Sequence, residues 1–174
     1  MCAQERLVLA LYGASCTGKT TVARILAKEL NCSLRSAGDA IRARSLELNV
    51  PQNSLALDEH RKIDETTRAM ARSSVGPLVI EGTFLGALLF DLKDIRRIKL
   101  ICAEGERRRR WESRGGTPLH SRDDADRRLR QCLHGCRADG TPDITIETSS
   151  RTPEEIAKEI NTWVQTKDDS EKPS

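Results

Sequence analysis

Eight residues near the start of the chain have the types and spacing of a phosphate-binding loop. Residues 13–20 have the sequence GASCTGKT, which fits the pattern G-x-x-x-x-G-K-[S/T]. Gly13 and Gly18 let the backbone curl so that successive N–H groups converge on phosphate oxygens, and a helix beginning near Gly18 adds the positive end of its dipole. Lys19 can then reach the β- and γ-phosphates, and the Thr20 hydroxyl can bind Mg²⁺. The pattern predicts a site for a nucleoside triphosphate with magnesium.

The whole loop is expected to contact the nucleotide. The residues concerned are Gly13, Ala14, Ser15, Cys16, Thr17, Gly18, Lys19, Thr20 and Thr21. The alternative is an ordinary glycine turn with a solvated lysine. Cys16 is interpreted as a small filler residue, with a thiol made more acidic by the helix N-terminus as the alternative.

A phosphate loop needs a strand before it and a helix after it, and the flanking residues supply both. Residues 6–12 (RLVLALY) form an apolar run of buried-strand length, and residues 18–30 have apolar residues at helical spacing. Further strands are expected at 77–82, 97–103 and 143–147, with an extended piece near 32–39. Helices are expected at 40–48, 55–73, 104–114, 123–134 and 152–164. This alternation predicts an α/β fold of three layers, a parallel sheet flanked by helices.

Composition and charge limit the class of protein. A length of 174 residues suits one domain, expected over 1–165 and followed by a flexible tail at 166–174. Charged residues reach 32%, but the net charge of +3 does not suggest a nucleic-acid partner. No apolar stretch approaches the roughly 20 residues that cross a bilayer, and residues 1–6 lack the positive charge of a secretion signal. We expect a cytoplasmic protein with no membrane partner.

The six cysteines show no disulfide framework, which suits a reducing compartment. Two of them lie in the segment CLHGC, residues 132–136. One interpretation of this segment is a zinc site. The simpler interpretation is a helix that carries two thiols one turn apart, because the sequence has no second ligand pair with suitable spacing.

Beyond the loop, the sequence offers an acid and a group of arginines that suit phosphoryl transfer. Glu81 ends a buried strand, at the edge where ligands of open parallel sheets bind, and it could hold Mg²⁺ or accept a proton; a loop or helix-capping carboxylate is the alternative. Arginines flank the loop GGTPLHS and predict a lid at about 104–134 that closes over the triphosphate. Arg110, Arg114 and Arg122 are the expected catalytic members, with solvated helix faces or nucleic-acid contacts as alternatives.

Small GTPases and larger ATPases fit the sequence less well. The chain has no D-x-x-G motif, and TKDD at 166–169 follows the last predicted helix instead of a buried strand. A small phosphotransferase remains.

The order of motifs resembles the cytidylate kinase-like branch of the nucleoside monophosphate kinases from about residue 7 to 163. The matching segments are GASCTGKTTVARILAKEL, RSAGDAIRARSLE, HRKIDETTRAMAR, PLVIEGTFLG and DITIETSSRTPEEIAKEI. The resemblance implies a P-loop kinase fold and an acceptor site to which Ser36, Asp39, Arg42 or Arg44, Asp64 and Arg68 contribute. Taken without it, Asp39 is expected to cap a helix that begins at Ala40. The family usually has an arginine where this chain has Thr83.

The leading hypothesis is a monomeric kinase that uses ATP and Mg²⁺ to phosphorylate a nucleoside monophosphate, most simply CMP or dCMP. In it, Lys19 holds the donor phosphates, while Thr20 and Glu81 hold the metal. The closest alternative is a kinase for a hydroxyl group of another small molecule, such as a sugar, a cyclitol or an antibiotic. A non-catalytic nucleotide-binding module or a chaperone-like ATPase is the alternative from a different class.

Overall fold

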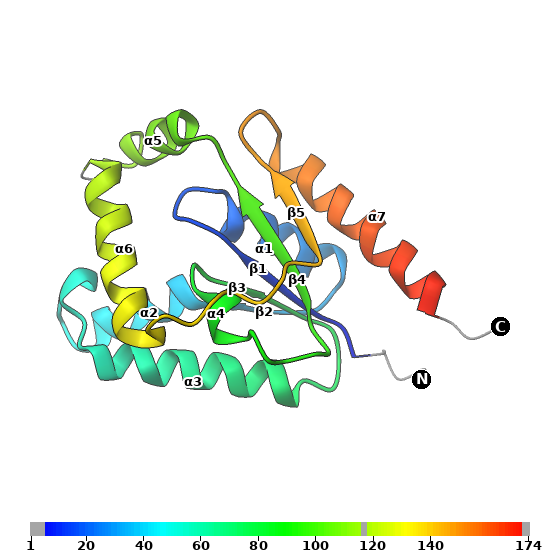
Figure 1. Cartoon of the computed structure of the whole chain (residues 1–174), viewed down its shortest axis with the longest axis horizontal. Coiled ribbons are helices and arrows are strands. Elements are labelled where there is room, and N and C mark those ends of the chain that lie inside the picture. Colours follow the sequence, from blue (N-terminus) through cyan, green and yellow to red (C-terminus); the bar gives the residue numbers. More distant parts are fainter. Residues whose placement is uncertain (1–5, 116–117, 172–174) are drawn as a thin grey trace.

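Five parallel strands form the centre of the molecule (Figure 1). The computed structural model describes residues 6–115 and 118–171. The strands are β1 (Val8–Tyr12), β2 (Ser33–Ser36), β3 (Leu78–Glu81), β4 (Arg96–Ile101) and β5 (Ile144–Glu147). They lie in the order β2-β3-β1-β4-β5 and every pairing is parallel. The strands expected from the sequence are confirmed.

Both faces of the sheet are buried under helices. Alternate residues of β1 point to opposite faces: Leu9 and Leu11 belong to the apolar core under α1 (Lys19–Glu29) and α7 (Pro153–Glu171). Val8, Ala10 and Tyr12 belong to the core under α3 (Leu57–Ser73) and α4 (Leu85–Leu88). Because the central strands β1 and β3 are covered on both sides, their apolar runs are continuous, whereas β4 and β5 alternate between buried and more exposed residues. The predicted three-layer α/β fold is confirmed.

The parallel arrangement brings the carboxyl ends of the strands to one edge of the sheet. Glu81, the last residue of β3, is in register with Leu11 of β1 and Ser36 of β2. The phosphate loop follows β1 at this same edge. The fold alone therefore places the predicted acid next to the predicted nucleotide site.

Two helices arch over this edge (Figure 1). They are α5 (Glu104–Glu112) and α6 (Leu119–His134), and with the segment between them they form what we call the lid, residues 104–134. The far end of α6 lies against α3, which also packs against α2 (Ala37–Glu47); α2 in turn contacts a short 3-10 helix, Gln52–Ser54. The lid therefore bridges the phosphate loop and α3.

Some element boundaries differ from those expected. Helix α2 begins at Ala37, and its N-cap is Ser36, whose Oγ accepts a hydrogen bond from the Asp39 N–H; the expectation that Asp39 caps a helix from Ala40 is wrong. Helix α6 begins at Leu119, inside the expected loop, and α4 was not expected at all.

The end of the chain also differs from the sequence-based expectation. Helix α7 continues to Glu171, so the tail expected at 166–174 is helical over most of its length. Residues 1–5 of the expected domain, 116–117 of the lid and 172–174 of the tail lie outside the described residues. Within the described part of the chain, none of the helices combines the length and the apolar character needed to span a membrane.

Candidate active site

The phosphate loop has a backbone that only particular residues can adopt. Its φ angles are positive at Gly13 (145°), Cys16 (66°) and Gly18 (91°), and Gly18 is the N-cap of α1. A Cβ on Gly13 would lie 2.1 Å from the carbonyl oxygen of Leu100 on β4. Glycine at position 13 is therefore required both by the backbone angle and by the close approach of β4.

Lys19 is held inside this loop. Its side chain is buried, and Nζ donates a hydrogen bond of 2.7 Å to the Ala14 carbonyl. Burial lowers the pKa of Lys19 from 10.5 to about 8, although the nearby carboxylates of Glu81 and Asp126 oppose the shift. A buried ammonium with so few partners is suited to an anionic ligand.

Glu81 and Thr20 form a cluster of oxygen atoms beside the lysine. Thr20 Oγ1 donates a hydrogen bond of 3.1 Å to Glu81 Oε1, and Ser36 Oγ donates to the same oxygen. Glu81 is only 3% exposed. Mg²⁺ prefers oxygen ligands and takes one or two carboxylates together with substrate phosphates, so the residues present fit a magnesium ion bound with the triphosphate. The hydrogen bond from Ser36 helps to fix the orientation of the Glu81 carboxylate.

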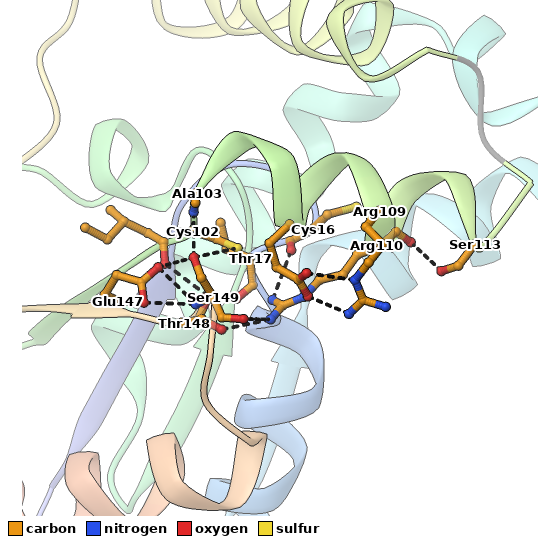
Figure 2. A network of polar contacts seen from close by, with 12 residues as sticks. Cys16, Thr17, Cys102, Ala103, Arg109, Arg110, Ser113, Glu147, Thr148 and Ser149 are labelled. Carbon is orange, nitrogen blue, oxygen red and sulfur yellow. Dashed lines mark hydrogen bonds and ion pairs between the residues drawn. The ribbon is translucent and has the colours of Figure 1, made fainter.

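The lid touches the phosphate loop through arginines of α5. Arg110 reaches the carbonyl oxygens of Cys16, Thr148 and Ser149, at 3.4, 2.8 and 3.4 Å (Figure 2). Arg107 donates to the Ser15 carbonyl at 3.0 Å. Thr148 Oγ1 in turn donates to the Thr17 carbonyl, which ties the segment after β5 to the same loop.

Helix α6 touches the loop through an acid. Asp126 accepts a hydrogen bond of 2.8 Å from Ser15 Oγ and forms an ion pair of 3.1 Å with Arg122. Arg122 Nε also lies 3.3 Å from Ser15 Oγ, and its guanidinium lies over the Trp111 ring. The side chains of Ser15, Arg122 and Asp126 thus form one cluster at the mouth of the loop.

A cavity lies on each side of the phosphate loop. One, of about 390 Å³, lies between Arg110 of the lid, Thr21 of α1 and the segment 148–153 after β5. The other, of about 260 Å³, includes Lys19, Thr20 and Glu81 and extends under α6 to α3. Arg114 borders both. Two cavities that share a phosphate loop suit a donor nucleotide and an acceptor.

The second cavity is lined by one face of each of two helices. From α6 come Arg122, Asp126, Leu129 and Leu133, and from α3 come His60, Ile63 and Asp64. Both sets have the spacing of a single helical face. Phe84 and Thr83, after β3, close the cavity from the sheet side. Its wall is therefore partly apolar and partly charged.

The structure brings some of the predicted acceptor residues to this cavity and not others. Arg42 and Asp64 line it. Asp39 is half exposed and pairs with Arg42 and Arg24. Arg44 pairs with Glu47 and Glu59 beside a different cleft, and Arg68 forms a two-pronged pair with Asp91. Of the alternatives Arg42 and Arg44, the structure therefore places Arg42 at the cavity. The other expected acceptor residues, Ser36, Asp39 and Arg68, are not among the residues that line it.

Several site residues were missed from the sequence. They are Arg107, His60, Phe84, Asp126, Leu129 and Leu133. The spacing of residues 126, 129 and 133 could have indicated the inner face of the helix expected at 123–134. The sequence did not show, however, which other element that face would contact. Arg107 could not be distinguished from the arginines that follow it.

The zinc interpretation of residues 132–136 gains no support. Cys132 and Cys136 are both exposed free thiols, and the described residues contain no group of three or more histidine, cysteine or acidic side chains that could hold a metal ion.

Solved structures share this fold at low sequence identity. Shikimate kinase from Acinetobacter baumannii, solved in complex with shikimate, is 17% identical, with a TM-score of 0.65 over 92% of this chain and 94% of that one. A gluconokinase from Sinorhizobium meliloti 1021 is 16% identical, with a TM-score of 0.60 over 93% and 98% of the two chains. The Mycobacterium tuberculosis APS kinase CysC, in complex with AMPPNP and APS, is 14% identical, with a TM-score of 0.57 over 93% of this chain and 99% of that one. The chain thus has the P-loop kinase fold, while these structures do not single out a cytidylate kinase.

Two matches concern the sequence itself. The Holliday junction branch migration complex subunit RuvB of Anaplasma phagocytophilum (strain HZ) is 33% identical over 121 residues, which are 63% of this chain and 37% of that protein. The chain thus matches little more than a third of the length of this relative. A family model described as "AAA domain" matches residues 9–132. This match covers more than half of the chain and includes both the phosphate loop and most of the lid, so the chain belongs to the AAA domain family.

Proposed function

We propose that the protein is a kinase that transfers the γ-phosphoryl group of ATP, with Mg²⁺, to a hydroxyl group of a small molecule that is not a nucleotide. The observation that supports this most is the position of Glu81. It is a buried carboxylate at the border between the phosphate loop and the second cavity, within hydrogen-bond distance of Thr20. A hydroxyl acceptor needs a group that takes its proton, and a carboxylate at this border can do so.

Each part of the site has a role in this proposal. The loop amides and Lys19 bind the donor phosphates, and the cavity beside Arg110 takes the adenosine end of ATP. Thr20 would hold Mg²⁺ directly and Glu81 would hold it through water, which leaves the Glu81 carboxylate able to take the acceptor proton; when bound, the ion would neutralise charge on the β- and γ-oxygens. Arg114 and Arg122 lie on the lid where charge on the phosphoryl group in transit needs cations. Lid contacts with Ser15 exclude water from the loop.

Fewer arginines than the resemblance implied are available to bind an acceptor phosphate. A nucleoside monophosphate carries a phosphate, which a guanidinium group commonly binds through two parallel N–H···O bonds. Here Thr83 replaces an arginine that the resemblance led us to expect, and Arg44 and Arg68 are held elsewhere by acids. The kinases named among the structural relatives also carry the names of acceptors other than nucleoside monophosphates.

A nucleoside monophosphate, most simply CMP or dCMP, is the second candidate. Arg42 and Arg114 both line the acceptor cavity, and the Arg42 guanidinium is half exposed. If Arg42 exchanged Asp39 for a phosphate, these two side chains could bind it.

The test measures ADP release from MgATP by the purified chain against a panel of sugars, cyclitols and aminoglycosides on one side and nucleoside monophosphates on the other. With a hydroxyl acceptor, Glu81→Gln should lower kcat by at least about 100-fold, as loss of a general base does, whereas Glu65→Gln, an exposed glutamate on α3, should not. Lys19→Ala should lose MgATP binding. Stimulation by CMP or dCMP alone would favour the second candidate. A flat panel with MgATP still bound would contradict both and favour a non-catalytic nucleotide-binding module.

A further inference from the structure

A buried polar pair lies at the end of the acceptor cavity remote from the phosphate loop. His134, the last residue of α6, places Nε2 3.3 Å from Oδ2 of Asp64 on α3. The His134 side chain is 4% exposed and that of Asp64 is 19% exposed. Within the part of the chain that the structure describes, neither of these two atoms has a hydrogen-bond partner of normal geometry. Each of the two atoms therefore has only the other close to it, and buried polar atoms with so few partners are uncommon in protein interiors.

Asp64 and His60 face the cavity together. Both line it, one helical turn apart on α3, with Ile63 between them. His60 is buried, and burial lowers its pKa although Asp64 opposes the shift. On the other side, Phe84 lies edge-on to the His134 ring at a centroid distance of 6.1 Å and also lines the cavity. This end of the cavity therefore combines a carboxylate and an imidazole with an apolar surround.

No fixed cation balances Asp64. In residues 6–115 and 118–171, no lysine or arginine forms an ion pair with it, and His134, which does contact it, is charged only if protonated. The arginines nearest to it on α3 are already used: Arg61 pairs with Asp58, and Arg68 pairs with Asp91. A carboxylate in such surroundings is costly unless hydrogen-bond donors or a cation reach it.

We propose that Asp64 accepts hydrogen bonds from an amine on the phosphoryl acceptor, and that His134 is the positioning residue that holds the carboxylate towards the cavity. The ligand chemistry is an N–H donor at the end of the acceptor remote from the phosphorylated group. Two sources share this chemistry, an aliphatic ammonium of an amino sugar or aminocyclitol and the exocyclic amine of a nucleobase. The inference rests on the proposed function only in taking the second cavity as the acceptor site.

The same geometry disfavours other groups at this position. A carboxylate or phosphate would lie against Asp64 with no arginine or lysine of the described residues paired there. A carbonyl oxygen would face the Asp64 oxygens with no hydrogen to share, and an unmatched buried polar group typically costs about 1–3 kcal/mol. At about 1.4 kcal/mol per factor of ten, this predicts a preference of roughly tenfold or more for the amine.

The test is equilibrium binding by calorimetry, with the full chain saturated with AMPPNP and Mg²⁺. Glucosamine is compared with glucose, and CMP with UMP, because the members of each pair differ at an amine. The inference expects at least tenfold tighter binding of the amine in one of the two pairs, and that pair identifies the source. In Asp64→Asn the preference should fall below about threefold. Asp58→Asn, an exposed acid on the same helix, should retain it.

The role of His134 is tested by conservative replacement. His134→Gln keeps an N–H donor near the position of Nε2 and should retain the amine preference. His134→Phe fills similar space without a donor and should lose it, with unchanged affinity for AMPPNP. Loss of preference in both variants, or in neither, would contradict the positioning role.

Equal affinities within both pairs, no binding of any of the four probes, or a preference that survives in Asp64→Asn would overturn the inference. ADP release with the same four compounds is measured separately. An Asp64-dependent amine preference without turnover would remove the kinase proposal and leave this inference. Turnover without any amine preference would support the kinase proposal and remove this inference.

Discussion

Replacing Lys19 by methionine should stabilise the nucleotide-free protein while abolishing triphosphate binding. The Lys19 side chain is buried, and its pKa falls from 10.5 to about 8. At about 1.4 kcal/mol per pH unit, keeping this ammonium charged at pH 7 costs the folded state roughly 3 kcal/mol. Methionine has a similar length and no charge, but it loses the hydrogen bond to the Ala14 carbonyl, which contributes about 0.5–1.5 kcal/mol.

The net gain for Lys19→Met at pH 7 is therefore about 2 kcal/mol. For a chain of this size each kcal/mol corresponds to about 2–4 °C in Tm, so Tm should rise by roughly 4–8 °C. Lys28→Met, an exposed lysine on the same helix, serves as the matched control and should leave Tm nearly unchanged.

The pH dependence distinguishes this cause from a general packing effect. The folded-state pKa lies below the unfolded value, so between about pH 8 and 10.5 the unfolded chain binds the proton more strongly. The cost to the wild type is full below pH 8 and disappears as the pH rises through this window. The advantage of Lys19→Met should therefore shrink above pH 8 and be gone by about pH 10.5.

The assay is urea unfolding of both proteins at pH 7 and pH 10, without nucleotide and with EDTA to remove metal ions. Contributions from other titrating groups cancel in the difference between the two proteins. A variant less stable than the wild type at pH 7, or a difference that stays constant between the two pH values, would refute the argument that the buried ammonium destabilises the fold.

Three further predictions follow from named contacts. Gly13→Ala should lower the free energy of unfolding by about 2–4 kcal/mol in urea titrations and abolish MgATP binding, because the new Cβ would collide with the Leu100 carbonyl; wild-type stability would contradict this. Arg110→Ala should raise the KM for ATP at least tenfold, because Arg110 joins the segment 148–149 to the phosphate loop. The control Arg108→Ala removes only an exposed ion pair with Glu104 and should leave the KM unchanged. Equal effects of the two variants would instead indicate a loss of helical structure in the lid. Ile160→Ala, fully buried between α7 and the sheet, should cost about 2–5 kcal/mol by the same titration without changing the ATP affinity of the folded protein.

The sequence was most informative where the chemistry is local. The phosphate loop is contiguous, and its glycines are required by its own backbone and by the neighbouring strand. The position of Glu81 followed from the end of an apolar run, because parallel strands all finish at one edge of the sheet. Helix α1 and the three-layer fold could also be predicted, because the spacing of apolar residues can be read within each segment by itself.

The residues that could not be predicted depend on contacts between distant segments. Arg44 matched an acceptor residue by motif, yet Glu59, fifteen positions away, holds it on another surface. The Asp64–His134 contact joins residues seventy positions apart, and nothing in either segment alone indicates the other. Which lid arginines face the loop likewise depends on the orientation of α5, which a run of four arginines does not define.

The cluster of Ser15, Arg122 and Asp126 has a kinetic consequence. The lid rests on the phosphate loop, and the Asp126 carboxylate accepts a hydrogen bond from the Ser15 hydroxyl at the mouth where an anionic phosphate would enter. A triphosphate that enters at this mouth must break the contact between Asp126 and Ser15, so the lid must first lift away. Association is then gated by an opening motion of the protein, and its rate should level off at high nucleotide concentration at the rate of that motion. The acid that holds the lid on the phosphate loop thereby also sets how fast nucleotide binding can begin.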